Sequence, residues 1–86
     1  MPKKEKIIIE IKEIISRISR IDAFELEENI AIRDELGVDS LMAMEIIATC
    51  EKQFQIHIDE GILFKIETIG DFFNLVTKLY EQKHGS

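Results

Sequence analysis

Apolar side chains recur at intervals of three and four residues along the first part of the chain. The repeating residues are Ile7, Ile8, Ile11, Ile14, Ile15, Ile18 and Ile21. This spacing places them on one side of an amphipathic helix over about residues 3–20, with charged side chains turned outward. Isoleucine is a weaker helix former than leucine, so a local strand over 6–11 is an alternative, but the longer period favours the helix.

Residues 22–38 show no sustained period, which predicts a long loop. A loop of this length in a small domain is usually functional or is packed down by its own apolar residues. The candidate anchors are Phe24, Leu26, Ile30, Ile32 and Leu36. Residues 34–36 could form one helical turn, which Gly37 would end.

The next helix is expected to begin at Asp39 and Ser40 and to end at about Phe54. Asp and Ser are favoured N-cap residues because their side-chain oxygens accept hydrogen bonds from free backbone N–H groups. Two apolar stripes follow this helix. The first comprises Ala43, Ile46, Ile47, Cys50 and Phe54, and the second comprises Leu41, Met44 and Ala48. One stripe suffices to pack a helix against a core, so the second needs either another packing partner or a reason to stay exposed.

The remaining residues predict an apolar connection over 56–58 and two further helices. Asp59 is expected to cap a brief helix over about 59–64, and Thr68 to cap a last helix over about 69–82. The apolar stripe of the last helix comprises Ile69, Phe72, Phe73, Val76, Leu79 and Tyr80. We therefore expect an all-α fold, a small four-helix bundle with three main helices, one short helix and a long first loop.

The composition indicates a single ordered domain, which we expect to span residues 1–86 with its core over about 4–82. Of the 86 residues, 45% are hydrophobic and 33% are charged. The formal net charge of −6 disfavours nucleic acid as a partner and favours basic protein surfaces. Positive charge gathers near the N-terminus, where we interpret it as a solvated helix face, with a basic docking edge as the alternative.

Few residues of the chain suit redox or metal chemistry. Cys50 is the single cysteine and falls in an apolar helical pattern, so we expect a buried thiol. His57 and His84 have no partner at metal-ligand spacing. Charged residues interrupt the apolar N-terminal segment, which argues against a signal peptide or a transmembrane span. We expect a monomer in the cytoplasm.

The segment with the clearest chemistry reads ELGVDSL over residues 35–41. It places the Ser40 hydroxyl in the first turn of a helix, directly after a glycine and an aspartate. A helix N-terminus carries about half a positive charge and free N–H donors, so it can accommodate a phosphate ester on that serine. Taken alone, Asp39 and Ser40 would also fit an ordinary N-cap pair.

The wider pattern resembles the acyl carrier protein family from about Ile7 to Leu79. LGVDSL is followed by an amphipathic helix that contains Glu45 and ends in FQIHI, then by D-x-x-x-x-F and a helix start that reads TIGD. The resemblance implies a carrier rather than an enzyme, with 4′-phosphopantetheine from coenzyme A attached covalently to Ser40. It also implies that Asp39 and Leu41 belong to the motif that a phosphopantetheinyl transferase recognises. Ser16 and Ser19 match no such motif.

The resemblance also offers a role for the second stripe of the Ser40 helix. Leu41, Met44 and Ala48 match positions that such carriers leave exposed for partner enzymes. Glu45 and Glu51 match acidic positions offered to the basic docking patches of acyl-chain synthases or transferases. The alternative is that Met44 packs against the long loop.

The sequence departs from carriers of fatty acid synthesis at Met42, where those carriers usually have an acidic residue. Lys52 and Gln53 also replace residues that are often acidic there. We expect a carrier of acyl thioesters in fatty acid or related lipid biosynthesis, with polyketide or aminoacyl and peptidyl assembly as the alternative. An unmodified helical interaction module is a further alternative. A hydrolase with Ser40 as nucleophile would need a base and an oxyanion hole that the sequence does not place near it.

Overall fold

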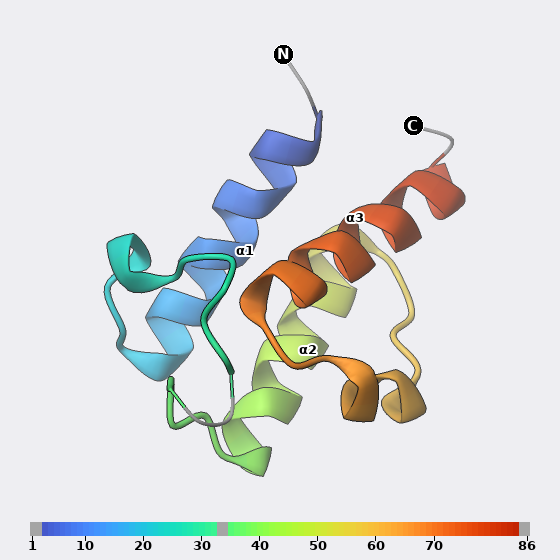
Figure 1. The fold of residues 1–86 in the computed structure, drawn as a ribbon. Coiled ribbons are helices and arrows are strands. Elements are labelled where there is room, and N and C mark those ends of the chain that lie inside the picture. The colour runs from blue at the N-terminus through green and yellow to red at the C-terminus, as the bar shows by residue number, and fades with distance from the viewer. Residues whose placement is uncertain (1–2, 33–34, 85–86) are drawn as a thin grey trace.

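A computed structural model describes the chain over residues 3–32 and 35–84, and it is helical throughout these residues apart from their connections (Figure 1). The elements in chain order are the α-helix α1 (Lys3–Ser19), the 3₁₀ turn η1 (Ala23–Glu25), the α-helix α2 (Ser40–Phe54), the 3₁₀ helix η2 (Glu60–Lys65) and the α-helix α3 (Ile69–His84). The prediction of an all-α bundle with three main helices, one short helix and a long first loop is confirmed. The last helix extends two residues beyond the predicted 82, and the short helix is 3₁₀.

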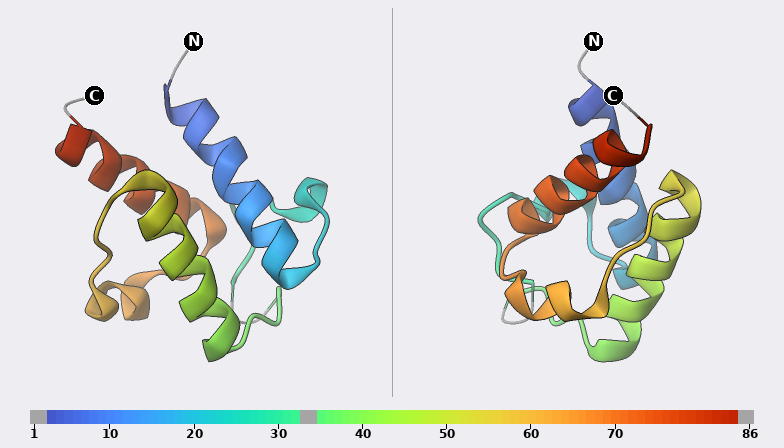
Figure 2. Two further views of the ribbon diagram at one scale, coloured as in Figure 1. Left: turned by 180° about the vertical axis from the view of Figure 1, so that it is seen from behind. Right: turned by 90° about the vertical axis from the view of Figure 1, so that its right-hand side faces the viewer.

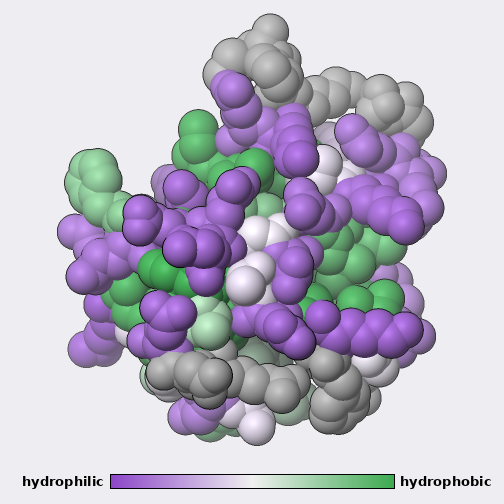
Figure 3. All heavy atoms as spheres, viewed as in Figure 1, coloured by the Kyte–Doolittle hydropathy of each residue, from purple (hydrophilic) through white to green (hydrophobic). Residues whose placement is uncertain are grey.

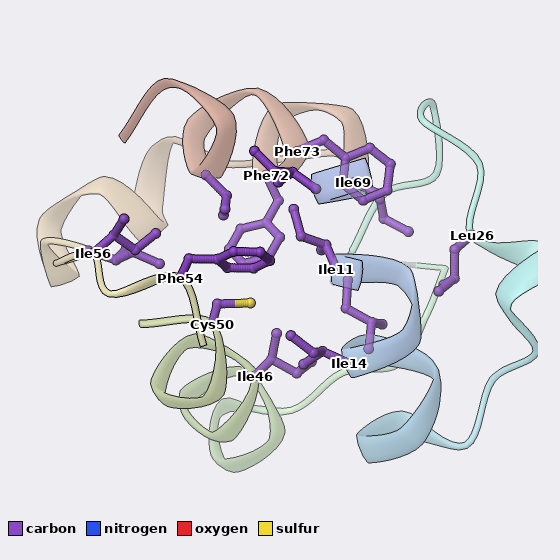
Figure 4. Close-up of a cluster of buried hydrophobic side chains, with 14 residues drawn as sticks. Ile11, Ile14, Leu26, Ile46, Cys50, Phe54, Ile56, Ile69, Phe72 and Phe73 are labelled. Atoms are coloured by element: carbon purple, nitrogen blue, oxygen red, sulfur yellow. The ribbon is translucent and has the colours of Figure 1, made fainter. Parts of the chain in front are cut away.

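The three long helices surround one core. α1 packs against both α2 and α3 and runs in the opposite direction to them (Figures 1 and 2). The buried apolar side chains of these helices meet between them (Figure 4). They are Ile7, Ile11, Ile14 and Ile15 of α1, Ile46, Cys50 and Phe54 of α2, and Ile69, Phe72, Phe73 and Val76 of α3. The predicted stripe on each helix therefore forms the core, with Ile18, Ile47 and Leu79 partly buried at its edge.

Cys50 lies inside this core with none of its surface exposed, as predicted. Burial raises the pKa of its thiol to about 12, and the neighbouring negative charge of Glu51 acts in the same direction. The thiol therefore stays protonated at neutral pH and serves as a small apolar side chain.

Four of the five predicted loop anchors are buried or partly buried. Leu26 is wholly buried, and Ile30, Ile32 and Leu36 pack against the core. The prediction for Phe24 is wrong, because its side chain is 92% exposed. Residues 23–25 form a 3₁₀ turn that contains Phe24, and Leu26 follows as its C-cap residue with its side chain in the core. With Leu26 turned inward, Phe24 is turned outward. The predicted helical turn over 34–36 lies partly outside the described residues.

The long first loop pairs through its backbone with the start of α3. The amide of Ile32 donates to the carbonyl of Glu67 at 3.0 Å, and the amide of Ile69 donates to the carbonyl of Ile30 at 3.0 Å. The amide of Gly70 then donates to the carbonyl of Glu28 at 2.9 Å. These bonds satisfy backbone groups that neither a loop nor a helix N-terminus can satisfy alone.

The start of α3 is closed by a reciprocal pair of side chains. Thr68 Oγ1 accepts from the amide of Asp71 at 3.1 Å, which confirms the predicted cap. Asp71 Oδ2 accepts in return from the amides of Thr68 and Glu67, both at 3.1 Å. This arrangement is a capping box, and the backbone hydrogen bonds from Thr68 and Glu67 lower the pKa of the Asp71 carboxyl.

Gly70→Ala is expected to destabilise the protein by about 1–3 kcal/mol, because an added methyl group would press against the backbone of the loop and force it to shift. An added Cβ would lie 3.0 Å from the carbonyl oxygen of Glu28 and 3.2 Å from its Cβ. Urea unfolding followed by circular dichroism measures the change in the free energy of unfolding.

Gly61→Ala is the matched control, because its Cβ would meet only Asp59 Oδ1 at 3.4 Å. This variant should unfold at nearly the wild-type urea concentration. A Gly70→Ala protein as stable as Gly61→Ala would show that the loop does not pack closely against α3.

Candidate functional site

The loop enters α2 through a sharp change of backbone direction at Gly37. Its φ of 64° lies in the left-handed region, and a Cβ built there would meet no atom within 4 Å. The position therefore favours glycine for its backbone conformation and not for lack of space. Leu36 and Val38, on either side, are half-buried and pack against the core. The residues just before the helix are thus anchored on both sides of the turn.

Asp39 caps α2 in the predicted way. Its backbone is extended, with φ −83° and ψ 177°, and its Oδ1 accepts from the amide of Met42 at 2.8 Å. Its carbonyl accepts from the amide of Ala43 at 2.9 Å. Ser40 follows as the first residue of α2, and both Asp39 and Ser40 are exposed. The residue predicted to hold the arm therefore lies at a capped helix end that is exposed, so another protein can reach it.

The environment of Ser40 suits a phosphate ester. The N-terminus of α2 carries partial positive charge from its aligned peptide dipoles, which stabilises a nearby anion. Because Ser40 is exposed, a group attached to its hydroxyl would extend into solvent without displacing core side chains. The residues present thus fit a phosphopantetheine arm, which Ser40 would hold at the helix end.

The serines of α1 are placed less favourably for modification. Ser16 is half-buried on the helix. Ser19 is also half-buried, and its hydroxyl donates to the carbonyl of Ile15 at 2.6 Å. Neither lies at a helix N-terminus.

The second stripe of α2 is exposed along its length. Leu41 is 76% exposed and Met44 is 61% exposed, and Ala48 and Glu45 are exposed beside them. Met44 therefore does not pack against the long loop, which was the alternative interpretation. The buried stripe faces the core on the other side of the helix. α2 thus offers an apolar surface with an adjacent carboxylate, beginning one residue after Ser40.

Glu51 is placed differently from Glu45. Its side chain is 30% exposed, its Oε2 accepts from the amide of Ile58 at 2.8 Å, and the same oxygen lies 3.5 Å from His57 Nδ1. The carboxylate therefore braces the turn that follows α2. The contribution of Glu51 to partner binding remains a prediction.

A second bracing carboxylate lies upstream of the motif and was missed by the sequence analysis. Glu35 Oε1 accepts from the amide of Ala31 at 3.1 Å, and the amide of Glu35 donates to the carbonyl of Ala31 at 3.0 Å. The spacing of four residues is the available signal, but in a segment without periodicity it does not predict this contact.

Both histidines lie at the end of α2 that is remote from Ser40. His57 follows the helix, and His84 Nε2 lies 3.0 Å from the carbonyl oxygen of Phe54, its last residue. A helix of 15 residues is about 22 Å long. Neither imidazole is therefore within hydrogen-bond reach of the Ser40 hydroxyl, so the hydrolase interpretation lacks a histidine base.

The described residues contain neither a cluster of metal ligands nor a membrane-spanning helix. No three of their histidine, cysteine, aspartate or glutamate side chains gather as ligands for a metal ion. Within the same residues, no helix combines the length and apolar character needed to cross a bilayer.

Comparison with known proteins gives consistent matches. A family model described as a phosphopantetheine attachment site matches residues 10–76. An acyl carrier protein of Thermotoga maritima is 32% identical over 78 residues, which cover 91% of this chain and 96% of that protein. An acyl carrier protein of onion yellows phytoplasma is 34% identical over 68 residues, covering 79% and 90%. The meromycolate extension acyl carrier protein of Mycobacterium leprae is 32% identical over 79 residues, covering 92% and 69%.

The matched region runs from within α1 to within α3 and includes the capped start of α2. Proteins of this family bear covalently attached 4′-phosphopantetheine and act as carriers, not as catalysts. The chain therefore belongs to the phosphopantetheine-attachment family, as an acyl carrier protein.

Proposed function

We propose that Ser40 is the residue to which phosphopantetheine is attached, and that the arm carries acyl groups as thioesters. The observation that carries the proposal is the position of Ser40, exposed in the first turn of α2 directly after the Asp39 cap. In the attachment step, a phosphodiester bond forms between Ser40 Oγ and the phosphate of the phosphopantetheine moiety. The pyrophosphate P–O bond of coenzyme A breaks at the same phosphorus atom, adenosine 3′,5′-bisphosphate leaves, and the hydroxyl proton passes to a base of the transferase or to solvent. The thiol of the arm then supplies the thioester chemistry.

The protein's own contribution to transport is to hold the arm where enzymes can reach it. The N-terminus of α2 stabilises the negative charge of the phosphodiester. The Asp39 cap and the anchored residues around Gly37 keep this end of the helix ordered. The attachment point is therefore rigid, and movement between enzymes is left to the arm.

The exposed face of α2 is proposed as the surface that partner enzymes recognise. Leu41, Met44 and Ala48 supply the apolar contact, and Glu45 supplies a negative charge beside it. An apolar centre with a charged rim is the usual composition of a protein interface. The net charge of −6 supports partners with basic docking patches. The proposed partners are a phosphopantetheinyl transferase and acyl-chain synthases or transferases, which a monomeric carrier visits in the cytoplasm.

The proposed pathway is fatty acid or related lipid biosynthesis. Two similar carriers, from Thermotoga maritima and Mycobacterium leprae, each align with more than nine-tenths of the chain, and the second bears a name for meromycolate extension. Polyketide assembly remains the second candidate because Met42 occupies a position that is usually acidic in fatty acid carriers. A peptidyl carrier is less favoured, since Gly37 is followed by Val38 and Asp39 and not by a second glycine.

Incubation with coenzyme A, Mg²⁺ and a phosphopantetheinyl transferase should add one phosphopantetheine mass to the wild-type protein. Ser40→Ala should gain no mass, because it lacks the only hydroxyl at the start of α2. Ser16→Ala and Ser19→Ala serve as controls and should react like the wild type. Intact-protein mass spectrometry makes the measurement, and modification that persists in Ser40→Ala would refute the assignment.

Met44→Glu should raise the KM of the transferase for the carrier by about 10-fold, because a charge replaces an apolar contact at the centre of the proposed interface. Asn74→Glu adds the same charge at an exposed position of α3 and should leave the KM unchanged. Steady-state kinetics with a varied carrier concentration separates KM from kcat.

A stability measurement separates docking from packing at Met44. Because the side chain is 61% exposed, Met44→Ala should cost less than about 1 kcal/mol, whereas truncation of a buried methionine costs about 2–5 kcal/mol. A large loss of stability, or an equal effect of Met44→Glu and Asn74→Glu on KM, would count against the docking face.

Octanoyl loading on the Ser40 arm should raise the melting temperature and shift core methyl NMR signals, whereas acetyl loading should do neither. Burial of six methylenes between the helices would contribute about 5 kcal/mol. Chain ordering and repacking of the core would offset roughly half of this. An unchanged melting temperature and unchanged spectra with octanoyl would favour the polyketide alternative, because polar intermediates gain little from an apolar core.

A further inference from the structure

Phe24 is the most exposed large apolar side chain of the described residues. It is 92% exposed, compared with 76% for Leu41, 61% for Met44 and 55% for Ile9. Leu41 and Met44 belong to the proposed docking face of α2, but Phe24 belongs to η1. In Figure 1 and in the reverse view of Figure 2, η1 lies beside α1, well apart from the start of α2.

The turn that carries Phe24 is held by three hydrogen bonds between residues two or three positions apart. Asp22 Oδ1 accepts from the amide of Phe24 at 3.0 Å, and the carbonyl of Asp22 accepts from the amide of Glu25 at 2.9 Å. The amide of Leu26 donates to the carbonyl of Ala23 at 3.1 Å, and the Leu26 side chain is wholly buried. The backbone beneath the aromatic ring is therefore ordered before any partner binds, which lowers the entropic cost of using the ring as an anchor.

Negative charge surrounds the ring along the chain. The exposed carboxylates within four residues of Phe24 are Asp22, Glu25, Glu27 and Glu28, and the exposed basic residue within that distance is Arg20. Figure 3, viewed as Figure 1, shows a hydrophobic group that projects beyond hydrophilic side chains at the left of the molecule, the side on which η1 lies. An aromatic anchor with a polar rim is the arrangement in which single side chains dominate the binding energy of protein interfaces.

We infer that Phe24 and these four carboxylates form a second docking point, which fits an enzyme that presents an apolar pocket bordered by lysine or arginine. The inference rests on the proposed function, because the partner is an enzyme that acts on the arm or on its thioester. The negative charge around Phe24 favours a partner surface that carries lysine or arginine side chains. A second copy of the chain would bring two acidic rims together, and an anionic lipid surface would repel the same rim.

The separation from Ser40 determines what this docking point does. A contact on η1 cannot take part in chemistry at the arm, so it contributes to association and not to the reaction rate. Its loss should therefore raise the KM of the partner for the carrier and leave kcat unchanged. The carboxylates should act through long-range attraction, so their contribution should fall as salt increases.

The test uses the 86-residue carrier with two enzymes of the same organism, the phosphopantetheinyl transferase and the acyl-chain condensing enzyme. Phe24→Ser should raise the KM of at least one of them 5- to 10-fold, with kcat within 2-fold of wild type. Phe24→Leu keeps an apolar anchor and should lie near wild type. Ile9→Ser, which removes another exposed apolar side chain, should not change either KM. Glu25→Gln with Glu27→Gln should raise the same KM at low salt and have little effect at high salt.

Urea unfolding should give the same stability for Phe24→Ser and wild type, since the ring is exposed. Unchanged KM values for both enzymes with Phe24→Ser would overturn the inference. A dimer that depends on Phe24 in sedimentation experiments would also overturn the inference. Binding to phosphatidylglycerol vesicles that depends on Phe24 would do the same. Failure of the proposed function differs from failure of this inference. In that case Ser40 would gain no phosphopantetheine in the wild-type carrier or in any variant at position 24.

Discussion

Backbone pairing between residues 28–32 and 67–70 holds the long first loop against the bundle. Three hydrogen bonds of 2.9–3.0 Å join two segments that are far apart in the sequence, and the absence of a side chain at Gly70 lets them approach. The capping box of Thr68 and Asp71 keeps one of these segments in place. This pairing anchors residues 28–32 of the segment that precedes α2, and the Asp39 cap then fixes the start of the helix at Ser40.

The two faces and the two ends of α2 have different roles. One face supplies Ile46 and Cys50 to the core, and the opposite face leaves Met44 exposed. The N-terminal end presents Ser40, while the C-terminal end is closed by contacts of Glu51 and His84 with the backbone. A partner can thus engage the exposed face and the proposed attachment residue without disturbing the core, which suits a protein that must meet several enzymes in turn.

Sequence periodicity was sufficient to predict the helices and the capped Ser40, because those features depend on residues close together in the chain. The same reasoning failed where distant segments decide the outcome. The apolar character of Phe24 predicts a loop anchor, but in the 3₁₀ turn its side chain faces solvent, while Leu26, just after the turn, is buried. The contacts of Gly70 with Glu28 are likewise set by tertiary packing, which no local pattern encodes.

In the function proposed for this carrier, one hydroxyl at the capped start of α2 holds the arm. The most direct test of this assignment is to load the wild-type protein with coenzyme A and a transferase, digest it, and fragment the modified peptide by tandem mass spectrometry. The phosphopantetheine mass should map to Ser40 in the peptide that contains the Asp39 cap. A modification that maps to Ser16, Ser19 or any other residue, while Ser40 stays unmodified, would contradict it.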